Sequence, residues 1–103
     1  MRMVLEHVVL PVRPGMEPDF EIAFQEAKGI ISAIPGFLSL RLLRGIENDS
    51  HYLLLVEWKS LEAHTIDFRQ SADYTRWSKL LHHFYDPFPN VEHFTSVDQV
   101  RAG

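Results

Sequence analysis

Cysteine is absent from the 103 residues of this chain. Its absence excludes disulfide bonds, thiolate metal sites and cysteine nucleophiles, so nothing in the sequence requires an oxidising compartment. Long hydrophobic runs are also lacking, because the longest aliphatic run covers only residues 53–56, whereas a membrane-spanning helix needs about 20 apolar residues. Glu6 and His7 interrupt the apolar segment near the N-terminus, which is therefore unlike a signal peptide. We expect a cytoplasmic protein with no membrane partner.

Clusters of positive charge and glycine-rich loops are scarce as well. The formal net charge is −4 and the lysines and arginines are dispersed, so the basic surface of a nucleic-acid-binding protein is not expected. The five glycines form no phosphate-binding loop and no nucleophile elbow, which leaves nucleotide and flavin binding unsupported. The six histidines lack the spacing of a zinc site. We therefore expect no nucleic-acid partner, no bound cofactor and no resident metal.

The residues that are present predict one α+β domain over residues 1–103. Four segments rich in aliphatic and β-branched residues are predicted strands: 3–12, 37–44, 51–58 and 91–97. Apolar residues at helical spacing predict a helix over about 17–34 and a broken helical stretch over about 61–68 and 71–84. The resulting order, β-α-β-β-α-β, is that of a ferredoxin-like domain with one four-stranded antiparallel sheet.

The predicted sheet is apolar on both faces. In the first strand Val4, Val8 and Leu10 alternate with Leu5 and Val9, and the third strand is similarly apolar on both sides. Two helical segments cover only one face, and each aliphatic side chain left in water forgoes about 1.5–3 kcal/mol. An exposed apolar patch of this kind is typical of an interface. We expect a second copy to cover the other face, forming a homodimer; a monomer with an uncovered face and a different partner protein are the alternatives.

Three histidines are candidates for acid–base chemistry. His7 lies between Leu5 and Val9 in the first strand, where we expect a buried imidazole suited to accepting a proton near neutral pH. His93 lies in the last strand and could share a pocket wall with His7 if these strands are neighbours and their register brings the two imidazoles together. His64 lies on the short helical segment, and from its position alone we expect it to face solvent or to make a capping-type hydrogen bond. A structural histidine, hydrogen-bonded to a neighbour, is the alternative for each.

Aromatic residues gather in the second half of the chain. The break in the helical stretch near residues 69–71 leaves room for a flat apolar pocket, which is the character of a small-molecule site. The predicted pocket residues, besides His93, are Trp58, Phe68, Tyr74, Trp77 and Leu81. Arg41 or Arg69 could supply a cation for an anionic ligand oxygen. A plain hydrophobic core with solvated arginines is the alternative interpretation.

Two stretches of the sequence resemble the antibiotic biosynthesis monooxygenase family. One is Val-Glu-Trp-Lys-Ser-Leu-Glu-Ala-His at 56–64, followed by Ser-Ala-Asp-Tyr at 71–74, and the other is Ile-Pro-Gly-Phe at 34–37. The order and length of the predicted elements are similar over nearly the whole chain. The resemblance implies a ferredoxin-like domain that pairs through its sheet as a dimeric α/β barrel, and it matches the family's tryptophan and histidine to Trp58 and His64.

The resemblance also implies an activity. We expect a cofactor-independent monooxygenase that oxidises an electron-rich aromatic (a quinol, anthrone or polyphenol) with O₂. Such a substrate reduces O₂ itself once deprotonated, so the protein must supply a base, for which His7 and His64 are the candidates.

Two other functions are open. One is a non-enzymatic dimeric module that binds a hydrophobic metabolite or takes part in a stress response. The other is haem binding or degradation, although positions 7, 67–68 and 77–78 lack the residues of the haem-degrading branch. A helix–sheet cavity wide enough for two fused rings, with a buried histidine, favours the enzyme. A cavity collapsed around Trp77 and Phe84 favours the binding or structural module.

Overall fold

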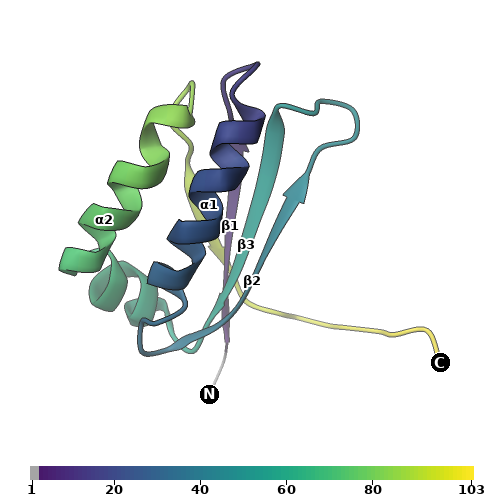
Figure 1. Ribbon diagram of the computed structural model, residues 1–103. Coiled ribbons are helices and arrows are strands. Elements are labelled where there is room, and N and C mark those ends of the chain that lie inside the picture. Colours follow the sequence, from purple (N-terminus) through teal and green to yellow (C-terminus); the bar gives the residue numbers. More distant parts are fainter. Residues whose placement is uncertain (1–2) are drawn as a thin grey trace.

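One four-stranded antiparallel sheet, with helices packed on one of its faces, forms the body of the protein (Figure 1). The computed structural model describes residues 3–103. The strands are β1 (Val4–Pro11), β2 (Phe37–Arg44), β3 (His51–Trp58) and β4 (Val91–Phe94). They lie in the order β2-β3-β1-β4, which is the ferredoxin-like arrangement. The predicted α+β fold is confirmed, although residues 1 and 2 of the predicted domain lie outside the described residues.

Helix α1 (Glu17–Ile31) covers the sheet with one apolar side. It begins with Pro18 in its first turn, where a missing N–H group costs nothing, and acidic residues there suit the positive end of the helix dipole. The sequence predicts that this helix ends at about residue 34, but it ends at Ile31. Ile34 precedes Pro35, and a residue before proline avoids helical backbone angles. Among the described residues, no helix has the length and apolar character needed to span a bilayer.

The second helical stretch is broken, as the sequence predicts. A π-helix, η1 (Ala63–Phe68), is followed by α2 (Ala72–Leu81) and by a single turn of 3₁₀-helix, η2 (His82–Phe84). Ser71 begins α2, since its hydroxyl oxygen accepts a hydrogen bond of 3.2 Å from the backbone N–H of Tyr74. The second helical stretch therefore consists of three consecutive pieces, which differ in helix type.

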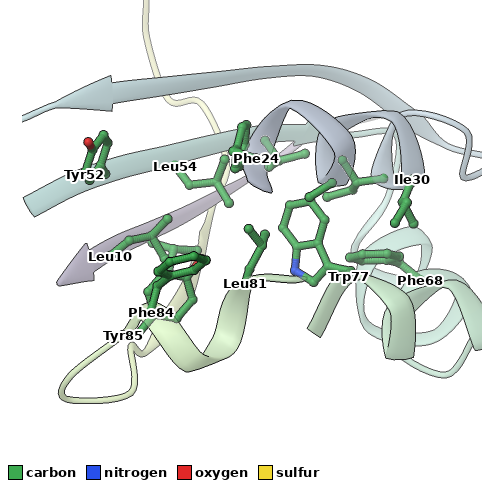
Figure 2. Close-up of a cluster of buried hydrophobic side chains, with 14 of the residues drawn as sticks. Leu10, Phe24, Ile30, Tyr52, Leu54, Phe68, Trp77, Leu81, Phe84 and Tyr85 are labelled. Atoms are coloured by element: carbon green, nitrogen blue, oxygen red, sulfur yellow. The ribbon is translucent and has the colours of Figure 1, made fainter. Parts of the chain in front are cut away.

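The hydrophobic core lies between these helices and the sheet. Figure 2 shows Trp77 and Leu81 of α2 in the same cluster as Leu54 of β3 and Phe24 of α1. The rings of Phe24 and Trp77 meet edge to face, with centroids 6.0 Å apart. Burial of such large side chains contributes about 1.5–3 kcal/mol each, which holds the helices against the sheet.

Alternation along β1 decides which residues meet the helices. The residues facing the helices are buried: Val4, Glu6, Val8 and Leu10. The opposite side of the sheet, here called the outer face, carries Leu5, His7 and Val9 of β1, Leu55 of β3 and Phe94 of β4. Val9 and Phe94 are each 47% exposed in the single chain. The second apolar face that the sequence predicts is therefore present and uncovered by the chain's own helices.

Candidate functional site

A pocket of about 360 Å³ opens between the sheet and the second helical stretch. Its volume lies within the range of about 300–1,000 Å³ that is typical of small-molecule sites. Most of the lining is apolar or aromatic. The lining side chains that carry a charge, an imidazole or an amide are Glu6, His64, Arg69, His82 and Asn90. A pocket lined by aromatic and aliphatic side chains and by several polar groups suits a small aromatic ligand with polar substituents.

Glu6 is the acidic group of this pocket. It lies on the helix-facing side of β1, between Val4 and Val8, and only 5% of its surface is exposed. The indole N–H of Trp58 donates a hydrogen bond of 2.9 Å to Glu6 Oε1. A buried carboxyl group is costly unless it is hydrogen-bonded, so Trp58 holds Glu6 in place.

His64 lies beside Glu6 and is 3% exposed. Its Nε2 lies 3.4 Å from Glu6 Oε1, and its ring stacks on that of Trp58 with centroids 5.3 Å apart. The expectation that His64 faces solvent is wrong. The reason is the π-helix η1, whose hydrogen bond from the Arg69 N–H to the His64 carbonyl spans five residues. Wider turns of this kind are frequent at functional sites, because they re-aim side chains.

His93 extends the group away from the pocket. Its Nε2 lies 2.8 Å from His64 Nδ1, a hydrogen-bond distance. The pairing of β1 with β4 places His93 opposite Glu6, on the helix-facing side of the sheet. Glu6, His64 and His93 together are here called the acid–base cluster. His64 turns one ring nitrogen to each neighbour, and within residues 3–103 no three such groups converge to hold a metal ion.

Burial sets the protonation states of the acid–base cluster. It raises the pKa of the Glu6 carboxyl to about 7, although the Trp58 hydrogen bond and the positive charge of Arg69 act in the opposite direction. Burial, together with the charge of Arg69 and the neighbouring His93, lowers the pKa of His64 to about 3. The pKa of His93 is also lowered, by burial and by Arg69. Near neutral pH both imidazoles are therefore uncharged, and Glu6 is the group that gains or loses a proton.

Aromatic rings form the wall that faces this cluster. Phe68 meets Tyr74 and Trp77 edge to face, with centroids 5.3 and 5.6 Å apart. His82 lies edge to face against Tyr74 and against Phe88, at 5.8 and 4.9 Å. Rings in these orientations present flat apolar surfaces and polarised edges, which can stack on an aromatic ligand.

The predicted site residues fall into three groups. Those that line the pocket are His64, Phe68, Arg69, Tyr74 and Trp77. Three other predicted residues are not part of the lining. Trp58 is hydrogen-bonded to Glu6, His93 is hydrogen-bonded to His64, and Leu81 lies in the hydrophobic core.

His7 and Arg41 lie elsewhere, on the outer face. Arg41 is exposed beside a groove of about 410 Å³ that Leu55 and Phe94 also line. His7 is partly exposed and meets the Phe94 ring at 5.6 Å. The strands β1 and β4 are neighbours, but their register does not bring His7 and His93 to one pocket wall. The register pairs His93 with Glu6, so the two imidazoles lie on opposite faces.

Glu6 itself is absent from the predictions made from the sequence. The signal was available, because positions 4, 6, 8 and 10 share one side of a strand. Three of these positions are aliphatic, so a carboxyl group at the remaining one must be buried among them. An isolated acidic residue on an apolar strand face is a strong indication of a functional group.

This chain is similar to known proteins in both sequence and fold. The family model described as antibiotic biosynthesis monooxygenase matches residues 3–80. YczJ of Bacillus subtilis, which is described as uncharacterized, is 48% identical over 95 residues, or 92% of this chain and 100% of YczJ.

Solved structures agree. A protein from Bordetella bronchiseptica, assigned by name to the antibiotic biosynthesis monooxygenases, is 35% identical and has a TM-score of 0.89; the match covers 94% of this chain and 99% of that one. A mutant of SnoaB, a cofactor-independent oxygenase from Streptomyces nogalater, is 18% identical with a TM-score of 0.84, covering 99% and 100% of the two chains. The SnoaB likeness concerns the fold alone.

Proposed function

This chain belongs to the antibiotic biosynthesis monooxygenase family, and from that premise we propose that it oxidises a small electron-rich aromatic with O₂ in the pocket beside Glu6. The observation that carries the proposal is the buried pair of Glu6 and His64 at one end of an aromatic-walled cavity. SnoaB has the same fold and is described as a cofactor-independent oxygenase, which supports the proposal of a reaction without a cofactor. The substrate class is a quinol, an anthrone or a related polyphenol.

The proposed reaction begins with removal of a proton. The Glu6 carboxylate, backed by His64, takes a proton from a hydroxyl group or an activated CH₂ group of the substrate. The Arg69 guanidinium lowers the pKa of acids near it, as it does for Glu6, and so favours the resulting anion. Because Glu6 ionises near pH 7, it can act as a base and then, once protonated, as an acid at working pH.

The remaining steps need only the substrate and O₂. The substrate anion gives an electron pair to O₂, which forms a C–O bond and a peroxide. Protonated Glu6 then delivers a proton to the peroxide. As the C=O bond forms, the O–O bond and the second C–H bond of the same carbon break, and the departing hydroxide takes that second proton and leaves as water; for an activated CH₂ group the sum is CH₂ + O₂ → C=O + H₂O. The apolar walls keep bulk water away from the peroxide while this occurs.

The open cavity favours this enzyme over a purely structural module. The pocket is not closed by Trp77 and Phe84: Trp77 lines it, and Phe84 packs in the core against Phe20 at 5.7 Å. The buried imidazole beside the cavity is His64. A module that only binds a hydrophobic metabolite has no need of a buried carboxyl group, which costs stability.

We also propose that the chain works as a homodimer paired through the outer face. Val9 and Phe94 are half exposed there, although aliphatic and aromatic side chains gain about 1.5–3 kcal/mol each from burial. The same face carries Leu5, Leu53 and Leu55, which are only partly covered. A second copy offers an equally apolar surface.

Oxygen consumption tests the proposed reaction. Wild-type protein is mixed with a panel of anthrones, naphthohydroquinones and simple polyphenols, and O₂ uptake is recorded with an electrode. We expect Glu6→Gln to lower kcat/KM for the best substrate by about 10²–10⁴-fold, because it removes the base while keeping the Trp58 hydrogen bond. His64→Gln should also lower kcat/KM for this substrate.

The matched control is His51→Gln, which changes an exposed histidine at the start of β3. It should keep full activity. O₂ uptake by Glu6→Gln at the wild-type rate would refute the assignment of the base, and a wild-type protein inert to every member of the panel would refute the substrate class.

A further inference from the structure

The acid–base cluster leads from the pocket to an edge of the sheet. Glu6 and His64 line the pocket, whereas His93 lies on the edge strand β4, where it is partly exposed. We propose that His64 and His93 relay protons between Glu6 and the solvent at β4. This inference rests on the proposed function, because it lets Glu6, as the base of that reaction, exchange its proton with solvent while a ligand occupies the pocket.

A route of this kind is needed because Glu6 has no direct access to bulk water. Only 5% of its surface is exposed, and that surface faces the pocket. A bound aromatic ligand would fill the pocket and seal Glu6 from solvent. Any proton that Glu6 exchanges with solvent while the pocket is occupied must then pass through the protein, and within residues 3–103 the imidazole of His64 is the ionisable side chain that contacts Glu6.

The distances suit a relay by exchange of tautomers. When Glu6 is protonated, it can donate to His64 Nε2, and His64 Nδ1–H then donates to His93 Nε2. When Glu6 is ionised, His64 Nε2–H faces the carboxylate, and Nδ1 accepts from His93 Nε2–H. The Nδ1–Nε2 distance of 2.8 Å already permits transfer between the rings. The contact of His64 with Glu6 is longer, at 3.4 Å, and catalytic contacts of this kind tighten when ligand binds.

At each transfer, a neutral imidazole gains a proton on one ring nitrogen and loses a proton from the other. The outward passage therefore leaves both imidazoles in the opposite tautomer. The proposed reaction later needs a proton for the peroxide, and the return of that proton through the same rings restores the first tautomers. One turnover thus resets the relay.

Neighbouring charges favour exchange over storage of a proton. The Arg69 guanidinium disfavours an imidazolium at both His64 and His93. The other ionisable side chains that line the pocket are Tyr74, Tyr85 and His82. Burial raises the pKa of the Tyr85 phenol and lowers the pKa of His82. The indole of Trp58, packed on His64 from β3, donates only to Glu6. His64 is therefore expected to pass protons between its neighbours while its own ring stays neutral.

Nuclear magnetic resonance of the substrate-free protein tests the relay without reference to activity. With ¹⁵N-labelled histidine, the ring nitrogens of His64 should exchange their protonated and unprotonated shifts near pH 7, as Glu6 ionises. Glu6→Gln should abolish this reversal. Glu92→Gln, an exposed carboxyl group on the same strand as His93, is the matched control and should leave it intact. A single His64 tautomer from pH 5 to pH 9 would refute the relay, whatever the enzyme turns over.

Kinetics with the quinol or anthrone that the wild type oxidises fastest give the second test. His93→Gln keeps a group that can hydrogen-bond to His64 but cannot pass a proton. We expect kcat to fall about 10- to 100-fold and KM to change less than about 2-fold, with recovery as imidazole buffer is added. An unchanged kcat, or a loss that imidazole does not restore, would contradict the relay. If no probe is oxidised, the proposed function fails while the magnetic resonance result still decides the relay.

Discussion

Glu6 combines a cost to stability with a use in chemistry. Its carboxyl group is buried among aliphatic side chains and held by one strong hydrogen bond, from Trp58. Burial raises the pKa of Glu6 to about 7, whereas a carboxyl group in the unfolded chain ionises near 4.5. The folded chain therefore keeps a proton that the unfolded chain releases between these two pH values. A residue that destabilises the fold in this way is typical of an active site.

The free energy of unfolding should report this proton directly. Between about pH 4.5 and 7 the folded state binds more protons at Glu6, so the contribution of Glu6 to stability falls as pH rises, by at most about 3 kcal/mol in total. His64 acts in the opposite direction, since its lowered pKa removes stability as pH falls below about 6.5. Glu6→Gln removes only the first effect.

We expect Glu6→Gln to gain stability relative to the wild type by about 2–3 kcal/mol between pH 5 and pH 8. Urea unfolding at the two pH values measures the change. Glu92→Gln, at an exposed position, should follow the wild type at both. A constant difference between Glu6→Gln and wild type across this range would show that Glu6 is not buried in its acid form.

At the scale of elements, the π-helix η1 orients the side chain of His64, and Gly36 packs against the first residue of η1. Gly36 has a φ angle of +92° in the turn that leads into β2, a backbone conformation that favours glycine. A Cβ atom at Gly36 would lie 2.7 Å from the Cβ of Ala63, the first residue of η1. The turn and the π-helix are therefore in close contact, and only glycine permits it.

Gly36→Ala should lower the free energy of unfolding by about 2 kcal/mol or more, because it adds both backbone strain and an overlap with Ala63. It should also lower turnover, since Ala63 precedes His64. Gly29→Ala is the matched control: Gly29 lies inside α1 with no atom near its missing Cβ, so alanine should stabilise the chain by about 0.5–1 kcal/mol. Equal effects of the two substitutions in thermal unfolding would contradict this account of the turn.

The elements were more predictable than the site for a physical reason. Strands and helices follow from local spacing of apolar residues, which is why the sheet and the break before Ser71 agree with the sequence. The orientation of His64 depends on a π-helix, whose wider turn has no marker in that spacing. The separation of His7 from His93 depends on the register between β1 and β4, which is a tertiary property.

At the scale of the whole molecule, the two faces of the sheet have different roles. Both α1 and α2 lie on one side of the sheet (Figure 1). That side carries the pocket and the acid–base cluster, and the outer face carries an uncovered apolar surface. The predicted apolarity of both faces was readable from the sequence, because it needs only the alternation along each strand. The proposed homodimer joins two outer faces and leaves each pocket intact.

Arginine substitutions at two exposed apolar residues test the proposed dimer interface. We expect the wild type to sediment as a dimer at micromolar concentration and Val9→Arg, on the outer face, to weaken the dimer at least about 100-fold, because a charge would be buried without a partner. Ile22→Arg, on the solvent side of α1 at a position 71% exposed, should leave the dimer unchanged. Sedimentation equilibrium distinguishes these outcomes, and a wild-type monomer would refute the dimer.

The placement of the pocket within one chain has a consequence for catalysis by the pair. In the proposed dimer the two outer faces would meet, so the acid–base cluster of each copy would lie on the side of its sheet that is turned away from the other copy. Mixed dimers with one wild-type and one Glu6→Gln chain should therefore keep half of the specific activity, with a Hill coefficient of one for substrate. The pairing would serve to cover apolar surface, and each copy would work as an autonomous catalyst.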